Sequence, residues 1–380
     1  MTSFMTADAQ KSVLHSPTCR LCRPNETRQL QDDNNDDDAM ISRIIKYPSR
    51  PSKPLTHTMT FFKKAAILST LCSSSVAFTT LGMSKQSATS LKSAVVDFSK
   101  YEGLGNDFIL VDDRDKDAPS LSPEQSEKLC NRNFGIGGDG VIFALKPPSD
   151  DYDFSMRIYN SDGSEPEMCG NGIRCFAQFL KDLGADAESY QVNTLAGRII
   201  PVMNDDGTIT VDMGEPILKA ADVPTTLAAN FEDDISVVEQ DLECNGKNWK
   251  VSAVSMGNPH CIIFVDDLEN DIDFESDGPA LESCEAFPAK TNVEFVQVMS
   301  DTHLKMKVWE RGAGPTLACG TGTCALVIAA IQAGKIPSGN KVRVTLPGGD
   351  LFIEWNKDTD NKVFMTGPAT YTFSGKAALK

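Results

Sequence analysis

Apolar and polar residues alternate along short stretches that begin near residue 93 and continue to the end of the chain. A period of two is typical of strands with one buried face. In the first half we expect strands at Ala94 to Tyr101, Phe108 to Asp112, Val141 to Leu145, Ser155 to Tyr159, Ser189 to Asn193 and Arg198 to Met203. In the second half we expect them at Val251 to Val254, Ile262 to Val265, Val293 to Val298, Leu304 to Trp309, Lys341 to Thr345 and Leu351 to Trp355.

Helical periodicity is confined to a few stretches. One runs from Pro123 to Asn131, a second is headed by Cys169 and stops at Gly184, and a third has its main part from Cys324 to Ala333. Because strands outnumber helices, the pattern predicts an α+β protein in which sheets wrap around few helices. A last strand around Val363 to Phe373 could return to the first half.

One motif is written twice, 150 residues apart. Met168 to Gly172 reads Met-Cys-Gly-Asn-Gly, and Ala318 to Gly322 reads Ala-Cys-Gly-Thr-Gly. Each motif opens an apolar helical stretch, and similar strand sequences precede both. A repeat this long predicts two duplicated domains, which usually enclose a ligand site between them. We place the first domain at residues 93–215, with 366–380 returning to it, and the second at 216–365, because Gly214-Glu215-Pro216 interrupts the pattern.

Composition excludes several classes of protein. The net charge of −17 over 380 residues argues against a nucleic-acid partner, which requires a basic face. No apolar run reaches the roughly 18 residues that a membrane span needs. The cysteine count of eleven is odd and follows no framework spacing, which favours free thiols in a reducing compartment. Cys19 and Cys22 have CxxC spacing, but no second pair completes a metal site.

Residues 1–92 differ from the rest and are interpreted as a leader. Residues 29–39 are polar and acidic, which predicts disorder. A basic start at Met59 to Lys64, an apolar run and then small residues form a signal-peptide pattern. The Val76-Ala77-Phe78 junction resembles the two-part presequences of algae with secondary plastids, so we expect plastid localisation and read residues 1–58 as an upstream extension. The alternative is an ordinary amphipathic segment.

The repeated motifs carry the candidate chemistry. Cys169 and Cys319 each stand at the start of a helix, where partial positive charge and free N–H groups are expected to lower a thiol's pKa. Two such thiols facing each other could remove a proton from one side of a carbon and return it on the other. Gly170, Gly172, Gly320 and Gly322 leave the backbone N–H groups open to a ligand. The alternatives are buried structural cysteines, as we expect for Cys175 and Cys324, or a disulfide.

The sequence contains no motif typical of a cofactor-dependent enzyme. No lysine lies in a Schiff-base motif, and no glycine-rich phosphate cradle follows a strand. Residues 135–140 are glycine-rich but lack the dinucleotide-binding spacing, and we interpret them as a turn.

Six motifs in order resemble the diaminopimelate epimerase family. They are Gly103 to Phe108, Asn160 to Ser164, Cys169 to Gly172, Gly257 to His260, Glu310 to Gly314 and Cys319 to Gly322. The resemblance covers about residues 94–378. It implies an isomerase that interconverts LL- and meso-diaminopimelate for lysine biosynthesis without a cofactor or metal. It also implies two pseudo-symmetric domains, each a curled mixed sheet around a central helix, and a possible homodimer.

The resemblance also implies a role for each site residue. Cys169 and Cys319 would be the acid/base thiols, assisted by His260 and Glu310. The reacting α-carboxylate would lie at the helix starts, and the distal amino-acid centre would be recognised by amides and a two-pronged guanidinium. The residues that would bind the α-carboxylate are Gly170, Asn171, Gly320 and Thr321. Those that would recognise the distal centre are Asn106, Asn160, Asn258, Asn292 and Arg311. Glu310 could also bind the amino group.

Two residues depart from the family pattern. Gly140 stands where many bacterial members carry Gln, and Pro315 stands where an acidic residue is common. Three rival functions stay open. The first is a proline racemase or hydroxyproline epimerase, the second a thiol redox switch and the third a binding protein without activity. A small-molecule amino-acid substrate is the partner we expect.

Overall fold

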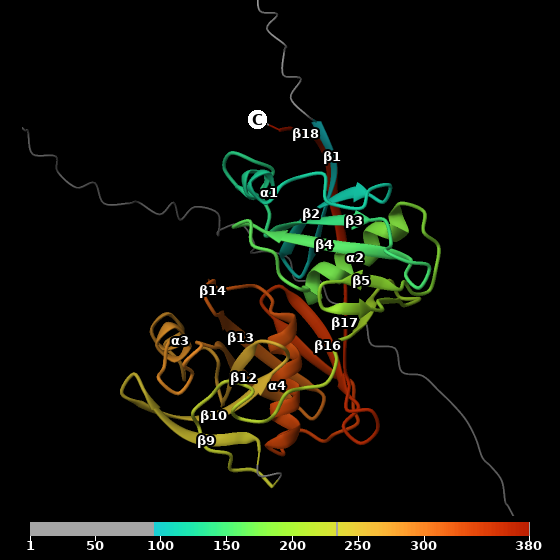
Figure 1. Cartoon of the computed structure of the whole chain (residues 1–380). Coiled ribbons are helices and arrows are strands. Elements are labelled where there is room, and N and C mark those ends of the chain that lie inside the picture. Colours follow the sequence, from blue (N-terminus) through green and yellow to red (C-terminus); the bar gives the residue numbers. More distant parts are fainter. Residues whose placement is uncertain (1–94, 233–234, 380) are drawn as a thin grey trace, which may run out of the picture. The chain divides into compact units, whose positions relative to one another are not determined.

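The computed structural model describes residues 95–232 and 235–379 (Figure 1). The proposed leader and the Cys19–Cys22 pair lie outside the described residues. The helices among them are α1 (Pro123–Cys130), α2 (Gly170–Asp182), α3 (Phe274–Glu282) and α4 (Gly320–Gln332). None of these helices has the length and apolar character needed to cross a membrane.

The first sheet has seven strands in the order β18-β1-β2-β3-β4-β5-β6. Its strands are β1 (Val95–Gly103), β2 (Asn106–Asp113), β3 (Gly140–Leu145), β4 (Phe154–Asn160), β5 (Val192–Thr194), β6 (Gly197–Ile199) and β18 (Thr370–Ala378). The C-terminal strand β18 pairs antiparallel with β1, so the end of the chain returns to the first half.

The second sheet has eleven strands in the order β7-β8-β17-β16-β15-β13-β12-β11-β10-β9, with β14 added beside β13. Its strands are β7 (Val202–Met203), β8 (Ile209–Asp212), β9 (Val237–Cys244), β10 (Lys247–Ser255), β11 (Pro259–Val265), β12 (Asn292–Ser300), β13 (His303–Glu310), β14 (Gly314–Pro315), β15 (Val342–Leu346), β16 (Gly349–Trp355) and β17 (Val363–Gly367).

The two halves repeat one pairing pattern. In the first, β1–β2 is antiparallel, β2–β3 parallel, β3–β4 antiparallel, β4–β5 parallel and β5–β6 antiparallel. In the second, the pairs β10–β11, β11–β12, β12–β13, β13–β15 and β15–β16 follow the same alternation. The helices also recur, since α1 and α3 link parallel strands and α2 and α4 follow β4 and β13. The predicted α+β fold with two related mixed sheets is confirmed.

Each half packs its sheet around one long helix. Ile173, Phe176 and Leu180 of α2 are buried against side chains of β2, β3 and β8. Helix α4 is apolar on all sides, and residues Ala325 to Ala330 are completely buried. A helix that is hydrophobic all round belongs in a protein core rather than on a surface. The sheets therefore fix both long helices from their first turn onwards.

One sheet runs across the boundary that we expected between domains. Strand β8 precedes the Gly214 interruption, yet it pairs with β17 of the second half. The division at residues 215/216 and 365/366 therefore stays a prediction.

Two expected strands are each divided in the structure. Residues 363–373 form β17 and β18, separated at Pro368, and residues 198–203 contribute to β6 and β7, separated at Pro201. In both cases a proline without a backbone N–H interrupts the ladder.

Candidate active site

Cys169 caps the first of the two long helices. Its backbone is extended, and its Sγ accepts a hydrogen bond from the Gly172 N–H at 3.4 Å. Asn106 at the start of β2 approaches the same sulfur, with its Oδ1 at 3.9 Å from Sγ. The Asn106 amide also receives a bond from Asn171 at 3.2 Å and donates to Asp139 at 2.7 Å. The thiol of Cys169 is thus surrounded by amides that the first half holds in place.

Cys319 caps the second long helix in the same manner. Its Sγ accepts from the Gly322 N–H at 3.4 Å and lies 3.5 Å from the Thr321 hydroxyl. Only 5% of the residue is exposed. Both candidate thiols are free in the structure, as are the other cysteines among the described residues, so no disulfide joins them there. The structure therefore places the two thiols in matching positions, as the repeat predicts.

The two helix starts contact each other. A Cβ atom built on Gly320 of α4 would lie 3.7 Å from Oδ1 of Asn171 in α2. The side chain of Met365 contacts both starts, because it lies 3.0 Å from a Cβ built on Gly170 and 3.1 Å from one built on Gly320. Glycine at both positions lets the two helix starts and Met365 come this close. The sequence motifs are therefore neighbours in space as well as copies in sequence.

Burial outweighs the helix N-terminus in setting both thiol pKa values. Burial raises the pKa of Cys169, although N–H groups of Gly172 and Asn171 act in the opposite direction. Burial raises the pKa of Cys319 well above its ordinary value, and the charges of Glu310 and Glu294 raise it further. The sequence predicted lowered pKa values from the helix position alone. That expectation is wrong for this structure, because desolvation of a thiolate costs more than the helix start returns.

A buried hydrogen-bonded chain lies behind Cys319. His260 Nδ1 lies 2.7 Å from Oε1 of Glu294, and His260 Nε2 lies 3.0 Å from Oδ1 of Asn258. Ligating atoms of His260, Glu294 and Cys319 all lie within 4.8 Å of one another. These residue types can bind transition metals, but both ring nitrogens of His260 are already engaged in hydrogen bonds. His260 therefore lies near the candidate thiol of Cys319.

Glu310 at the end of β13 is close enough to act on both thiols. Its negative charge contributes to the raised pKa of Cys319 and also of Cys169, in each case after burial. Burial raises the pKa of Glu310 itself, while a hydrogen bond from Thr316 opposes that shift. A carboxyl whose pKa is raised by burial keeps its proton to a higher pH than an exposed one, so Glu310 is a candidate to influence the protonation of the two thiols.

The residues assigned to distal recognition form separate local groups. Asn292 donates to the Pro259 carbonyl at 2.9 Å and accepts from the Arg311 N–H at 2.9 Å, which fixes the start of the Arg311 loop. The Arg311 guanidinium donates to the Ala289 carbonyl at 3.2 Å and remains exposed. Asn160 bonds Ser164 across its own turn at 3.0 Å. Asn106 and Asn171 join the Cys169 group, and Asn258 joins the His260 group.

Sequence reasoning missed two buried charged residues beside the thiols. Arg174 in α2 is fully buried and donates to Asn171 Oδ1 at 2.9 Å, to the Gly170 carbonyl at 3.2 Å and to the Pro368 carbonyl at 3.1 Å. Glu294 in β12 is also fully buried. Aligning the two repeats at their 150-residue offset would have drawn attention to Arg174, which stands opposite Cys324, whereas Glu294 stands opposite Ile142 only through the strand register.

The two departures from the family pattern have local explanations. A Cβ on Gly140 would lie 2.8 Å from the Tyr159 carbonyl oxygen, so the backbone of β4 leaves no space for a side chain there. Pro315 pairs with Trp309 in the two-residue strand β14. Neither residue forms a hydrogen bond with a candidate thiol.

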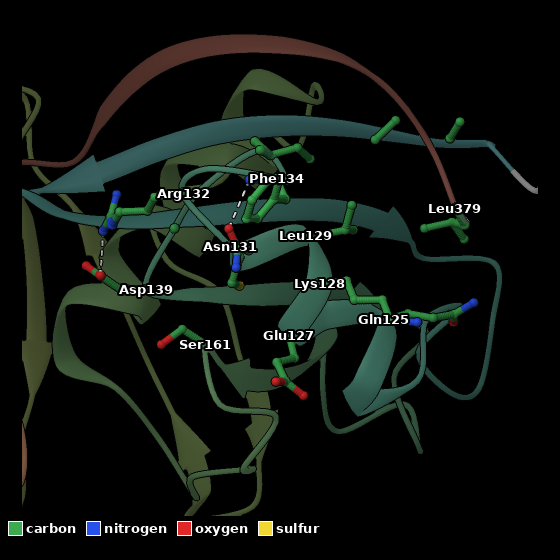
Figure 2. A pocket seen from close by; sticks show the side chains of 16 residues that line it. Gln125, Glu127, Lys128, Leu129, Asn131, Arg132, Phe134, Asp139, Ser161 and Leu379 are labelled. Atoms are coloured by element: carbon green, nitrogen blue, oxygen red, sulfur yellow. Dashed lines mark hydrogen bonds and ion pairs between the residues drawn. The ribbon is translucent and has the colours of Figure 1, made fainter. Parts of the chain in front are cut away.

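A cavity of about 690 Å³ lies beside α1 and the end of β18 (Figure 2). Arg132, Asp139 and Ser161 line one end, and the exposed ring of Phe134 lies near the middle. The Arg132–Asp139 ion pair at 2.7 Å connects this end to Asn106, because Asp139 also accepts from that amide. The thiols do not line this cavity.

Comparison with known proteins identifies relatives over most of the chain. The sequence pattern described as diaminopimelate epimerase matches residues 98–219 and 252–372. A protein named diaminopimelate epimerase from Acaryochloris marina is 56% identical over 285 residues, which cover 74% of this chain and 98% of the relative. The rice protein named diaminopimelate epimerase, chloroplastic, is 53% identical over 292 residues, which cover 74% of this chain and 79% of the relative.

Solved structures show the same fold at low sequence identity. A PhzF-family phenazine biosynthesis protein from Bacillus anthracis superposes with a TM-score of 0.55 and 17% identity, covering 75% of this chain and 99% of that chain. A hydroxyproline epimerase from Agrobacterium vitis superposes with a TM-score of 0.54 and 12% identity, covering 75% of this chain and 93% of that chain. At these identities the likeness extends to the fold alone.

Proposed function

The chain belongs to the diaminopimelate epimerase family, and we propose that it interconverts LL- and meso-diaminopimelate in lysine biosynthesis. The observation that carries this proposal is the contact between two cysteine-capped helix starts, Cys169 on α2 and Cys319 on α4. The chain supplies both thiols in the same relation to their helices, as a reaction that must work from two faces of one carbon requires.

The proposed reaction moves one proton in and one proton out. A thiolate on one cysteine takes the proton from Cα and becomes a thiol, while the C–H electron pair passes into the α-carboxylate. The thiol of the other cysteine then gives its proton to the opposite face of Cα and becomes a thiolate. The product has the inverted centre, and the enzyme ends with its thiol and thiolate exchanged. No atom other than hydrogen is transferred.

The helix starts would stabilise the charge that develops on the carboxylate. Backbone N–H groups near Gly170, Asn171, Gly320 and Thr321 lie at two positive helix ends. An anion between them would accept hydrogen bonds from both halves at once. These hydrogen bonds would also lower the free-energy cost of removing the weakly acidic Cα proton, because the extra negative charge develops on carboxylate atoms that the helix starts already bind.

The distal amino acid would be recognised by residues of both halves. Arg311 is exposed and its backbone is anchored by Asn292, so its guanidinium is available for a carboxylate. Asn106, Asn160 and Asn258 supply amides that can accept from an ammonium group or donate to a carboxylate. Glu310 and His260 would adjust the protonation of the thiols, since both lie close to Cys319. This set favours a long dipolar substrate over the ring of proline.

The test is turnover by the purified full-length protein. LL-diaminopimelate, proline and trans-4-hydroxyproline should be incubated separately and their stereoisomers resolved by chiral chromatography. We expect conversion of LL- to the meso form until both are present, with no added cofactor, and no racemisation of the two ring substrates. Conversion of proline at a similar rate, or no conversion of diaminopimelate, would contradict the proposal.

A variant of Arg311 tests whether the distal carboxylate of the substrate is recognised, and it leaves both thiols in place. Arg311→Leu removes the guanidinium, and we expect KM for diaminopimelate to rise by about 10- to 100-fold because a charged hydrogen bond contributes about 1.5–3 kcal/mol. Ser161→Ala, at the equivalent place in the first half, is the matched control and should leave KM unchanged. An unchanged KM in Arg311→Leu would show that Arg311 does not contribute to substrate binding.

The N-terminal region is proposed to direct the protein to a plastid. The family match begins at residue 98, and the rice relative is named chloroplastic. A fluorescent reporter fused to residues 59–100 should enter the plastid, and a reporter that stays in the cytosol would contradict the proposal. A homodimer also remains a proposal, which sedimentation of the purified protein would test.

A further inference from the structure

The two thiol sites occupy equivalent positions but rest on different side chains. In the first half, β2 and β3 pair Phe108 with Gly140; in the second, β11 and β12 pair His260 with Asn292. Two residues further along the second strand of each pair stand Ile142 and Glu294. The apolar pair Phe108 and Ile142 in one half therefore corresponds to the polar pair His260 and Glu294 in the other.

Contacts with the helices support this equivalence. A Cβ on Gly172 would lie 3.1 Å from Cδ1 of Ile142, and a Cβ on Gly322 would lie 2.4 Å from Oε1 of Glu294. Both glycines are the third residue of their helix. Glu294 thus brings a carboxylate to the start of α4 at the place where the first half has only a methyl group.

Glu294 has few partners to balance its charge. Its Oε1 bonds His260 at 2.7 Å, and its Oε2 has no hydrogen-bond partner among the described residues. A buried carboxylate is costly unless other groups compensate it. Besides His260, the nearby compensation is the positive start of α4, which is also the group that would favour a thiolate on Cys319. Two anions would then compete for one helix start.

The surroundings of Cys169 are opposite in character. Arg174 places a buried guanidinium next to the start of α2, where its counterpart in the other half is the uncharged Cys324. The charged and titratable groups near Cys169 are Arg174 and Cys175 from α2 and Glu310 from β13. Those facing Cys319 are Glu294 from β12, His260 from β11 and Glu310 from β13. One thiol has a cation beside it and the other has an additional carboxylate.

We propose that Glu294 is a positioning residue that makes the two thiols unequal: it disfavours the thiolate of Cys319, so when one of the two thiols of the enzyme is ionised, the thiolate lies on Cys169. This inference rests on the proposed function, but the ionisation of each thiol can be measured without a substrate. The directions of the pKa shifts agree. After burial, which raises both, Arg174 lowers the pKa of Cys169 whereas Glu310 and Glu294 raise that of Cys319.

The test measures each thiol separately in the absence of substrate. The full-length protein and its Glu294→Gln variant are treated with iodoacetamide across a range of pH, and alkylation of Cys169 and Cys319 is quantified by peptide mass spectrometry. In the natural protein, Cys169 should react faster near neutral pH. In Glu294→Gln, we expect alkylation of Cys319 at fixed pH to rise about tenfold, which corresponds to a midpoint lower by about one pH unit. Cys169 should keep its profile.

Two further variants keep the test decisive. Asp277→Asn removes another fully buried carboxylate, the partner of Lys247 at 2.7 Å, and should leave both thiols unchanged. The double variant His260→Phe with Glu294→Ile copies the first half, and an apolar replacement of a buried pair is often tolerated. Its Cys319 profile should also move to lower pH, and circular dichroism checks that each variant is folded.

Three results would overturn the inference. They are an unchanged or slower Cys319 in both folded variants, a natural protein in which Cys319 reacts faster than Cys169, and an equal change at both thiols. The proposed function fails differently, through absence of turnover by the natural protein. The two failures are therefore distinguishable.

Discussion

The two halves share a backbone plan but differ in the charges that they place beside their cysteines. Strand pairing follows the same alternation in both, and α2 and α4 start at positions 150 residues apart and have 13 residues each. In the first half, Cys169 lies near a buried guanidinium; in the second, Cys319 lies near a buried carboxylate and a histidine. The repeat supplies the geometry of the site, and the differences between the repeats supply its chemistry.

This comparison explains why the site needs both copies. A single cysteine-capped helix can bind a carboxylate and remove a proton, but it cannot reach the opposite face of the same carbon. A second copy supplies that reach through the same local sequence. Once the second copy exists, the residues behind it are free to diverge, as Phe108 with Ile142 and His260 with Glu294 have done. Divergence can then tune each thiol for its own half of the reaction.

The largest effect should come from removing either thiol. Cys169→Ala and Cys319→Ala should each lower kcat by about 10²- to 10⁴-fold, because each removes a general acid or base. Binding of diaminopimelate, measured by calorimetry, should persist. Cys175→Ala is the control, since it is a fully buried helix residue that the reaction does not use. Substantial racemisation by either alanine variant would contradict the proposal that the reaction requires both thiols.

The next effect concerns Arg174 and its counterpart. Arg174→Met would remove the side-chain donor to the Gly170 and Pro368 carbonyls and to the Asn171 amide oxygen, so we expect the free energy of unfolding to fall by about 2–4 kcal/mol. Cys324→Ala should cost about 1 kcal/mol, because it removes only a small buried side chain. Urea denaturation measures both. Equal losses would mean that Arg174 acts only as packing.

A smaller effect should distinguish the two glycines at the third helix position. Gly322→Ala would place a methyl 2.4 Å from a carboxylate oxygen held by His260, and we expect a loss of about 1–3 kcal/mol. Gly172→Ala meets the movable end of Ile142 at 3.1 Å, and its cost should stay within about 1 kcal/mol. Thermal unfolding of both variants provides the measurement. The reverse order would contradict the close approach of Glu294 to α4.

The smallest effect is a pH dependence that belongs to the second half. Burial raises the pKa of Glu310, so the folded protein keeps that proton at a pH where the unfolded chain has lost it. Stability from this group is present at low pH and is lost as pH rises from about 4.3 through the folded pKa. Glu310→Gln keeps an oxygen for Thr316 but cannot ionise, and its counterpart in the first half is the neutral Asn160.

We therefore expect the free energy of unfolding of Glu310→Gln to fall less steeply with rising pH than that of the natural protein. Urea denaturation at several pH values between 4 and 8 gives both slopes, with Asn160→Gln as the control. Identical slopes in all three proteins would show that this carboxyl does not change protonation on folding.

Much of the fold could be predicted from local pattern. Strands with clean alternation, such as β4 and β13, and the cysteine-headed helices were predicted close to their observed bounds. Helix α1 carries a capping box between Ser122 and Gln125, a signal that the sequence shows directly. Helix α3 was missed because it contains Pro279 and its first turn is acidic rather than periodic. Pairing of β8 with β17 links residues far apart in sequence, which no local pattern reports.

The candidate site was predicted in part for similar reasons. The motifs identify Cys169, Cys319 and His260, because each lies in a distinctive sequence. Glu294 lies among buried residues of β12, so its sequence context reads as an ordinary buried strand. Only the pairing of β11 with β12 places it behind Cys319. The thiol pKa values could not be predicted from helix position, since burial depends on how tightly both halves close around each sulfur.

The location of solvent hydrogen tests the two-thiol account most directly. LL-diaminopimelate should be incubated with the full-length protein in deuterated water, and substrate and product recovered after a small fraction has reacted. If one thiol removes the proton and the other returns one, the meso product carries deuterium at its inverted carbon while recovered LL substrate remains unlabelled. Equal early labelling of substrate and product, or a product that retains the original hydrogen, would contradict the account.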